Sequence, residues 1–71
     1  MAEVNERNFK AIWMKSSDKV AIAYGSKRVM NVIKVSENYD LAGLNEMQIA
    51  ELVFNSVKKD AIDVVADHLG A

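Results

Sequence analysis

The longest regular pattern of hydrophobic and polar positions runs from Asn45 to Leu69. After Asn45, apolar residues recur at spacings of three and four, which places them on one side of an α-helix. Asn45 and Gln48 have the spacing of a capping box, in which each side chain accepts a hydrogen bond from the other residue's backbone N–H. The pattern therefore predicts a helix that begins after Asn45, with an apolar stripe made of Ile49, Ala50, Val53, Phe54 and Val57.

The apolar stripe changes direction near Lys59. From Ala61 to Leu69 its centre lies roughly 90° further round the helix, and aspartates occupy part of the earlier apolar arc. Because one straight helix cannot bury both stripes on one neighbour, we expect the helix to bend or break near Lys59. The second helix is expected to end at Leu69, with Gly70 as the residue that follows it. An alternative is a fourth strand over residues 61–66, which the β-branched residues there permit.

Three shorter segments have the composition of β-strands. Phe9–Met14 contains aromatic residues, Val20–Tyr24 alternates large apolar residues with alanine, and Val29–Val35 is rich in β-branched residues. Short polar turns separate the three segments, and Gly25 in the second turn can take a positive φ. A helix capped by Asn5 is the alternative for the first segment.

These elements predict an α+β fold in a single small domain over residues 1–71. The expected order is β-β-β-α-α, a three-stranded antiparallel meander followed by a long helix that is broken or bent near Lys59. A strand over residues 61–66 would change the order to β-β-β-α-β. Residues 1–7 are polar and lack a period, so we expect them to fray, and we expect Ser36–Leu44 to be a loop.

Both faces of the predicted sheet carry apolar residues. One layer of helix covers only one face, so the other would remain exposed, as surfaces that bind partners often are. We assign four apolar residues to this second face: Ile12, Met14, Met30 and Val32.

Composition favours association with a partner. The chain has 71 residues, of which 51% are hydrophobic, and a chain this short buries only about 60% of its unfolded surface. It contains no Cys and one His, which excludes disulfides and a Cys/His zinc site. Oligomerisation is the remaining common way to stabilise a small core. We expect neither a metal nor a cofactor.

Membrane and export signals are absent from the sequence pattern. No apolar run approaches the ~18 residues of a membrane span. The first residues also lack the basic start and apolar stretch of a signal peptide. We therefore expect a cytoplasmic protein.

Charge divides the chain into two halves. Residues 1–36 carry seven basic and three acidic residues, whereas residues 37–71 carry two basic and seven acidic residues. The net charges are thus +4 and −5. Such asymmetry indicates either a basic surface for an acidic partner or attraction between the two halves, within one chain or between two copies.

Catalytic chemistry has little support in the sequence. His68 lies in the last turn of the predicted helix, where the helix dipole favours a cation, and no nucleophile accompanies it. Asp60, Asp63 and Asp67 share one helical face, a spacing that is more typical of a solvated surface than of a metal site. Gly25-Ser26-Lys27 lacks the upstream glycine of a phosphate-binding loop. We therefore expect no enzyme activity and assign no catalytic residue.

The preferred interpretation is a small interaction or assembly module that forms homo-oligomers, most simply a homodimer, through apolar helix and sheet faces. On this interpretation the contact residues come from both layers of the fold: Val53, Phe54, Val57, Val64, Val65, Leu69, Ile12, Met14, Met30 and Val32.

The alternative is a small regulatory protein that binds nucleic acid through a basic, aromatic sheet. Bases stack on aromatic rings and phosphates meet Lys or Arg in such sites. The residues that would form this surface are Lys10, Trp13, Lys15, Lys19, Tyr24, Lys27, Arg28 and Lys34.

Overall fold

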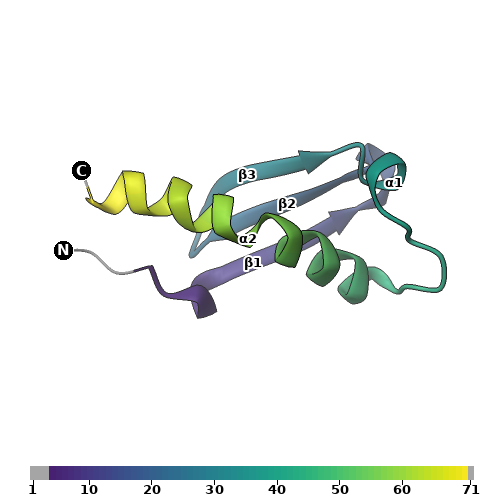
Figure 1. Cartoon of the computed structure of the whole chain (residues 1–71), viewed down its shortest axis with the longest axis horizontal. Helices are drawn as coiled ribbons and strands as arrows, with labels where there is room; N and C mark the ends of the chain where they lie inside the picture. The colour runs from purple at the N-terminus through teal and green to yellow at the C-terminus, as the bar shows by residue number, and fades with distance from the viewer. Residues whose placement is uncertain (1–3, 71) are drawn as a thin grey trace.

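Three antiparallel strands form one sheet, and one long helix lies across one face of it (Figure 1). The computed structural model describes residues 4–70. In chain order the elements are η1 (Glu6–Asn8), β1 (Phe9–Met14), η2 (Lys15–Ser17), β2 (Lys19–Tyr24), β3 (Lys27–Ile33), α1 (Val35–Asn38) and α2 (Glu46–Gly70). The α+β class and the three-stranded meander followed by helix are therefore confirmed.

The sheet has the strand order β1-β2-β3, and both neighbouring pairs are antiparallel. The predicted bounds of β1 agree with the structure, and β2 begins one residue earlier than predicted. A two-residue turn joins β2 to β3, and Gly25, its first residue, has a φ of +64°. A positive φ at the first of the two turn residues is the pattern of a type II′ hairpin, whose twist matches that of the strands it joins.

The third strand ends earlier than the sequence predicted. Its predicted range was Val29–Val35, but β3 ends at Ile33, and Lys34 takes a left-handed conformation with a φ of +53°. Val35 then begins the single turn of α1 and is fully buried. The expected loop over Ser36–Leu44 therefore starts with a helical turn.

A contact between distant residues fixes this reversal. The Asp18 carboxylate accepts hydrogen bonds from the Ser36 backbone N–H at 2.9 Å and from the Ser36 hydroxyl at 2.6 Å. The Val35 N–H also donates to the Asp18 carbonyl at 3.1 Å. These bonds tie the β1–β2 turn to the end of β3. They hold Val35 in a helical turn, although its β-branched side chain favours a strand.

Helix α2 is continuous from Glu46 to Gly70, so of the predicted bend or break near Lys59 the break is wrong, as is the alternative strand over residues 61–66. Four of its buried residues, Ile49, Val53, Ala61 and Val65, follow one another at multiples of four. A row at this spacing winds slowly around a helix, at about 26° to its axis. Since α2 crosses the strands obliquely (Figure 1), one unbroken helix can bury the whole winding row.

The core lies between α2 and one face of the sheet. Its fully or nearly fully buried members are contributed by β2, α1 and α2, and partly buried residues of β1 and β3 pack around them. The buried cluster consists of Val20, Ile22, Val35, Ile49, Val53 and Ala61.

The predicted capping box at the start of α2 is confirmed. The Gln48 backbone N–H donates to Asn45 Oδ1 at 2.8 Å, and the Asn45 N–H donates to Gln48 Oε1 at 3.0 Å. Both bonds satisfy backbone groups that have no partner inside the helix.

Replacing Asn45 with Ala is expected to lower the free energy of unfolding by about 0.5–2 kcal/mol, because the Gln48 N–H loses its acceptor. Urea unfolding followed by far-UV circular dichroism measures this change. Asn45→Asp is the matched control, since it keeps the acceptor and adds a negative charge at the positive end of the helix dipole. Equal stability of Asn45→Ala and the unchanged chain would contradict the assigned role of the cap.

Candidate interaction surfaces

The helix residues predicted to form an interface are mostly engaged by the chain's own sheet. Val53 is fully buried and Val65 is 2% exposed, while Phe54, Val57 and Val64 are half-buried. Phe54 lies against Phe9 of β1, with ring centroids 5.3 Å apart. The side chain of Leu69 lies outside the described residues. The apolar stripe of α2 therefore serves mainly the core of a single chain.

The four sheet residues predicted to form a second patch do not share a face. Met30 and Val32 pack on the core beneath α2, opposite Ile22 and Val20 in the neighbouring strand. Ile12 and Met14, by contrast, lie on the side of the sheet that faces away from α2, which we call the open face. Alternation within β1 and β2 had been assigned correctly. In β3 the expectation that Val29 lies on the opposite face from Met30 is wrong, because the bulge lets Val29 pack on the core beside it, and the relation between strands depends on their pairing register.

The predicted nucleic-acid residues are also divided between the two faces. The rings of Trp13 and Tyr24 lie on the helix side, where Tyr24 packs edge-on against Phe9 at 5.0 Å and its hydroxyl accepts a hydrogen bond from the Asn5 N–H. Lys10, Lys19 and Arg28 belong to the open face. The other cations occupy turns or the hairpin end: Lys15, Lys27 and Lys34. Rings and cations therefore do not form one stacking platform.

The open face consists of three rows of residues that run across the sheet. At its centre Ala21 and Ala23 of β2 lie between longer side chains of β1 and β3, and Ala21 is only 6% exposed. Two large apolar side chains remain exposed on it, Ile12 at 59% and Ile33 at 63%. From one end to the other the rows are Met14–Lys19–Ile33, Ile12–Ala21–Asn31 and Lys10–Ala23–Arg28.

Strand β1 forms one edge of the sheet, and half of its backbone groups point away from β2. The Gly25 N–H donates to the Asn8 carbonyl at 2.9 Å in the same register that pairs β1 with β2. Since hydrogen-bonded pairs alternate in an antiparallel ladder, the even-numbered residues of β1 bond to β2. The N–H and C=O groups of Ala11 and Trp13 consequently face outward from the edge, as does the Phe9 C=O, whereas the Phe9 N–H donates to the Glu6 carbonyl.

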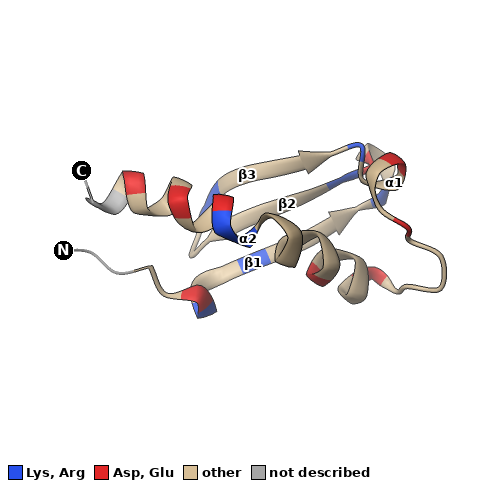
Figure 2. Ribbon diagram, viewed as in Figure 1, with Lys and Arg blue, Asp and Glu red and all other residues tan. Residues whose placement is uncertain are grey.

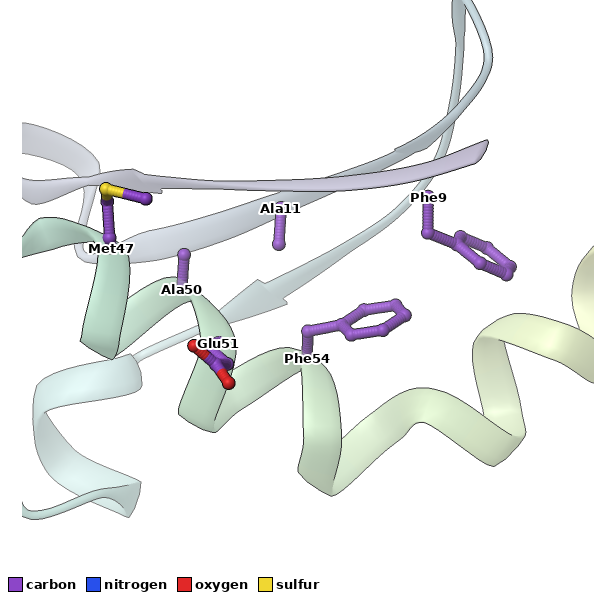
Figure 3. Close-up of a pocket in the computed structure, with 6 residues that line it drawn as sticks. All are labelled: Phe9, Ala11, Met47, Ala50, Glu51 and Phe54. Carbon is purple, nitrogen blue, oxygen red and sulfur yellow. The ribbon is translucent and has the colours of Figure 1, made fainter. Parts of the chain in front are cut away.

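A shallow groove runs beside this edge, between β1 and the first half of α2 (Figure 3). One part of it has a volume of about 250 Å³, and Phe9 and Ala11 project into it toward the helix. Met47, which reaches toward β1 from the helix, is 82% exposed. The lining of this part is completed by Ala50, Glu51 and Phe54.

A second hollow of about 430 Å³ lies at the other end of β1, where the chain enters α2. Trp13 and Lys15 line it from the strand side, and Leu44 and Ile49 line it from the helix side. Both hollows border β1, so apolar surface accompanies this edge along most of its length.

The opposite edge, β3, is protected against pairing. Its register with β2 shifts between Ile22 and Ala23, so that Val29 is an extra residue in the strand. Lys27, Arg28 and Asn31 are polar and exposed. Bulges and charged residues are common devices that keep edge strands from pairing with other chains. Strand β1 has no register shift and no proline, and Lys10 is its one charged residue.

Groups with catalytic potential are dispersed. His68 is exposed in the last turn of α2, and Asp60, Asp63 and Asp67 are exposed along it. The described part of the chain contains no group of three or more His, Cys, Asp or Glu side chains that could hold a metal ion. Ser56 Oγ donates to the Val53 carbonyl within its own helix, at 2.9 Å.

The β1 edge was missed at the sequence level, although a signal for it existed. Trp13 and Phe9 on one face and Ile12 and Met14 on the other make β1 apolar on both sides, whereas β3 is marked by Lys and Arg. Comparing the two outer strands for such protective residues would have indicated which edge is open.

No helix within residues 4–70 has the length and apolar content needed to cross a membrane. Comparisons with protein-family models, curated proteins and solved structures found no significant match, so the chain's own geometry is the basis for assigning a function.

Proposed function

We propose that this chain is a non-enzymatic assembly module that forms a homodimer by pairing the β1 edges of two copies. The observation that carries the proposal is the unprotected β1 edge, where the outward backbone groups of Ala11 and Trp13 and the Phe9 C=O have no neighbouring strand within residues 4–70. An edge of this kind pairs readily with another strand.

The geometry of β1 is compatible with pairing to itself. A two-fold axis makes the two β1 strands antiparallel, and residues opposite each other then project to the same side of the sheet. Registers that place odd residues opposite odd residues join the outward N–H and C=O groups and put both α2 helices on one face. A register shifted by one residue would place outward groups of one strand opposite groups of the other that already bond to β2. It would also put the two α2 helices on opposite faces of the sheet.

Two such registers centre on the middle of the strand. In one, Ala11 lies opposite Ala11 of the partner subunit, and in the other Ile12 lies opposite Ile12 of the partner subunit. Both give a continuous six-stranded sheet with its two β3 strands at the outer edges, where the bulge and the charged residues already prevent further pairing. The assembly therefore closes as a dimer.

Met47 adds apolar contact area near the axis. It lines the same groove as Ala11 and is the most exposed large hydrophobic residue among those described. Because Met47 lies beside the edge that pairs, dimerisation would cover part of its side chain. Fully burying a side chain of this size contributes about 1.5–3 kcal/mol, so covering Met47 at the interface would stabilise the dimer.

The test is to block the edge without disturbing the fold. Ala11→Pro removes one outward N–H and leaves the β1–β2 hydrogen bonds in place, because proline is tolerated where the N–H of an edge strand faces outward. Light scattering coupled to size-exclusion chromatography is expected to give twice the chain mass of 7.9 kDa for the unchanged protein and 7.9 kDa for Ala11→Pro.

Asn31→Pro is the matched control. Even-numbered residues of β2 bond to β3, opposite Val32 and Met30, so the Asn31 N–H faces outward at the protected edge. This variant should remain dimeric. Met47→Lys provides a second variant at an exposed position, and it should weaken the dimer while leaving the circular dichroism spectrum unchanged. A monomeric unchanged protein, or a folded Ala11→Pro that dimerises with unaltered affinity, would refute edge pairing.

A further inference from the structure

The open face has a composition that dimerisation through β1 does not explain. Lys10, Lys19 and Arg28 project from it, and none of its strand residues is acidic. The negative charge of the fold lies mainly on α2, on the other side of the sheet, as the ribbon in Figure 2 shows. Within residues 4–70 the ion pair of the structure joins Lys58 to Glu6 at 2.5 Å, and so involves none of these three cations.

The shape of the open face suits a helix. Ala21 and Ala23 occupy the central strand, with Ile12 on one side and Ile33 on the other. Ala21 is only 6% exposed, so the apolar contact that this face offers comes mainly from the two exposed isoleucines. Exposed apolar side chains together with cations in both end rows are the complement of an amphipathic helix with acidic flanks.

We propose that the open face binds an acidic amphipathic helix of another protein. Its apolar stripe would lie against Ile12 and Ile33, over the alanines of β2, and its carboxylates would meet Lys10 and Arg28 at one end and Lys19 at the other. This inference concerns the open face of a single chain, so it stands independently of the pairing of β1.

Two other occupants fit the face less well. Single-stranded nucleic acid would match the cations, but Trp13 and Tyr24 lie on the helix side, which leaves no ring on the open face for bases to stack on. A second copy's α2 is acidic, but its apolar stripe is already buried, with Val53 at 0% and Val65 at 2% exposure. A helix supplied by a different chain has its apolar side available.

The probe for this proposal is a synthetic helical peptide of about 18 residues with leucine on one face and glutamate and glutamine on the other. Amide chemical shifts of the whole chain are followed by NMR during titration, and affinity is measured by fluorescence anisotropy. We expect shifts at Ile12, Ala21 and Asn31 and none at Leu52 and Asn55, which lie on the exposed side of α2.

Charge reversal supplies the decisive comparison. Lys10→Glu combined with Arg28→Glu should weaken peptide binding on the order of tenfold or more, since like charges then face each other. Lys59→Glu, a charge reversal at an exposed site on α2, should leave the affinity unchanged. A scrambled peptide of equal composition tests whether charge alone suffices and should bind weakly.

Three results would overturn the proposal. They are the absence of shifts at millimolar peptide, shifts that map to α2 instead, and equal binding by the doubly reversed variant. Tighter binding of mixed-sequence single-stranded RNA to the same residues would replace the proposed partner by nucleic acid. Each outcome is separate from the mass measurements that test dimerisation.

Discussion

Replacing Val65 with Asp is expected to unfold the chain rather than to separate a dimer into folded monomers. Val65 is 2% exposed within a single chain, so a carboxylate there would lose its hydration without gaining a partner. The cost of an uncompensated buried charge is several kcal/mol. A domain of this size has a total stability of roughly 4–11 kcal/mol, so one such substitution removes most of it.

Ala66→Asp is the matched control for this substitution, because Ala66 is the next residue along α2 and is exposed. It should keep the helical circular dichroism spectrum and cooperative thermal unfolding, whereas Val65→Asp should lose both. A folded, monomeric Val65→Asp would show instead that Val65 contacts a second chain, as the sequence pattern had suggested.

Replacing Ile22 with Ala is expected to lower the free energy of unfolding by about 2–5 kcal/mol, because it opens a cavity under α2. Ile22 is fully buried at the centre of the middle strand, and Met30 lies opposite it in β3. Urea unfolding at a fixed protein concentration gives the change, since the apparent stability of a dimer depends on concentration.

Ile33→Ala removes the same atoms from the other face of the sheet. Ile33 is 63% exposed, so its loss should change the stability by only about 0.5 kcal/mol or less. Similar losses for the two variants would mean that the open face is covered in solution, and would point to an additional apolar contact there.

Much of the local structure was readable from the sequence because the interactions behind it span only a few residues. The capping pair of Asn45 and Gln48 is three residues apart, and both of its hydrogen bonds are present. The alternation of Phe9–Met14 follows from the two-residue repeat of a strand, and β1 has those bounds. Gly25 supplies the positive φ that the first residue of its own turn requires.

The candidate surfaces were only partly readable. Sequence alternation showed that the sheet has apolar residues on both faces, and Ile12 and Met14 do lie on the open face. It could not show that Met30 and Val32 belong to the covered face, because that depends on which residues pair across β2 and β3. The sequence also does not show directly that β1 is an unpaired edge of the sheet.

The sequence alone determined the class of the fold, the start of α2 and the alternating sides of β1 and β2, since these depend on propensity, period and contacts within a turn. Tertiary structure decided the rest. The angle of α2 on the sheet lets one unbroken helix bury a winding row, and Asp18, eighteen residues before Ser36, ends β3 at Ile33. Strand pairing left β1 as an edge and Lys10, Lys19 and Arg28 on one face. Contacts between residues far apart in the chain fix these features, and no local pattern specifies such contacts.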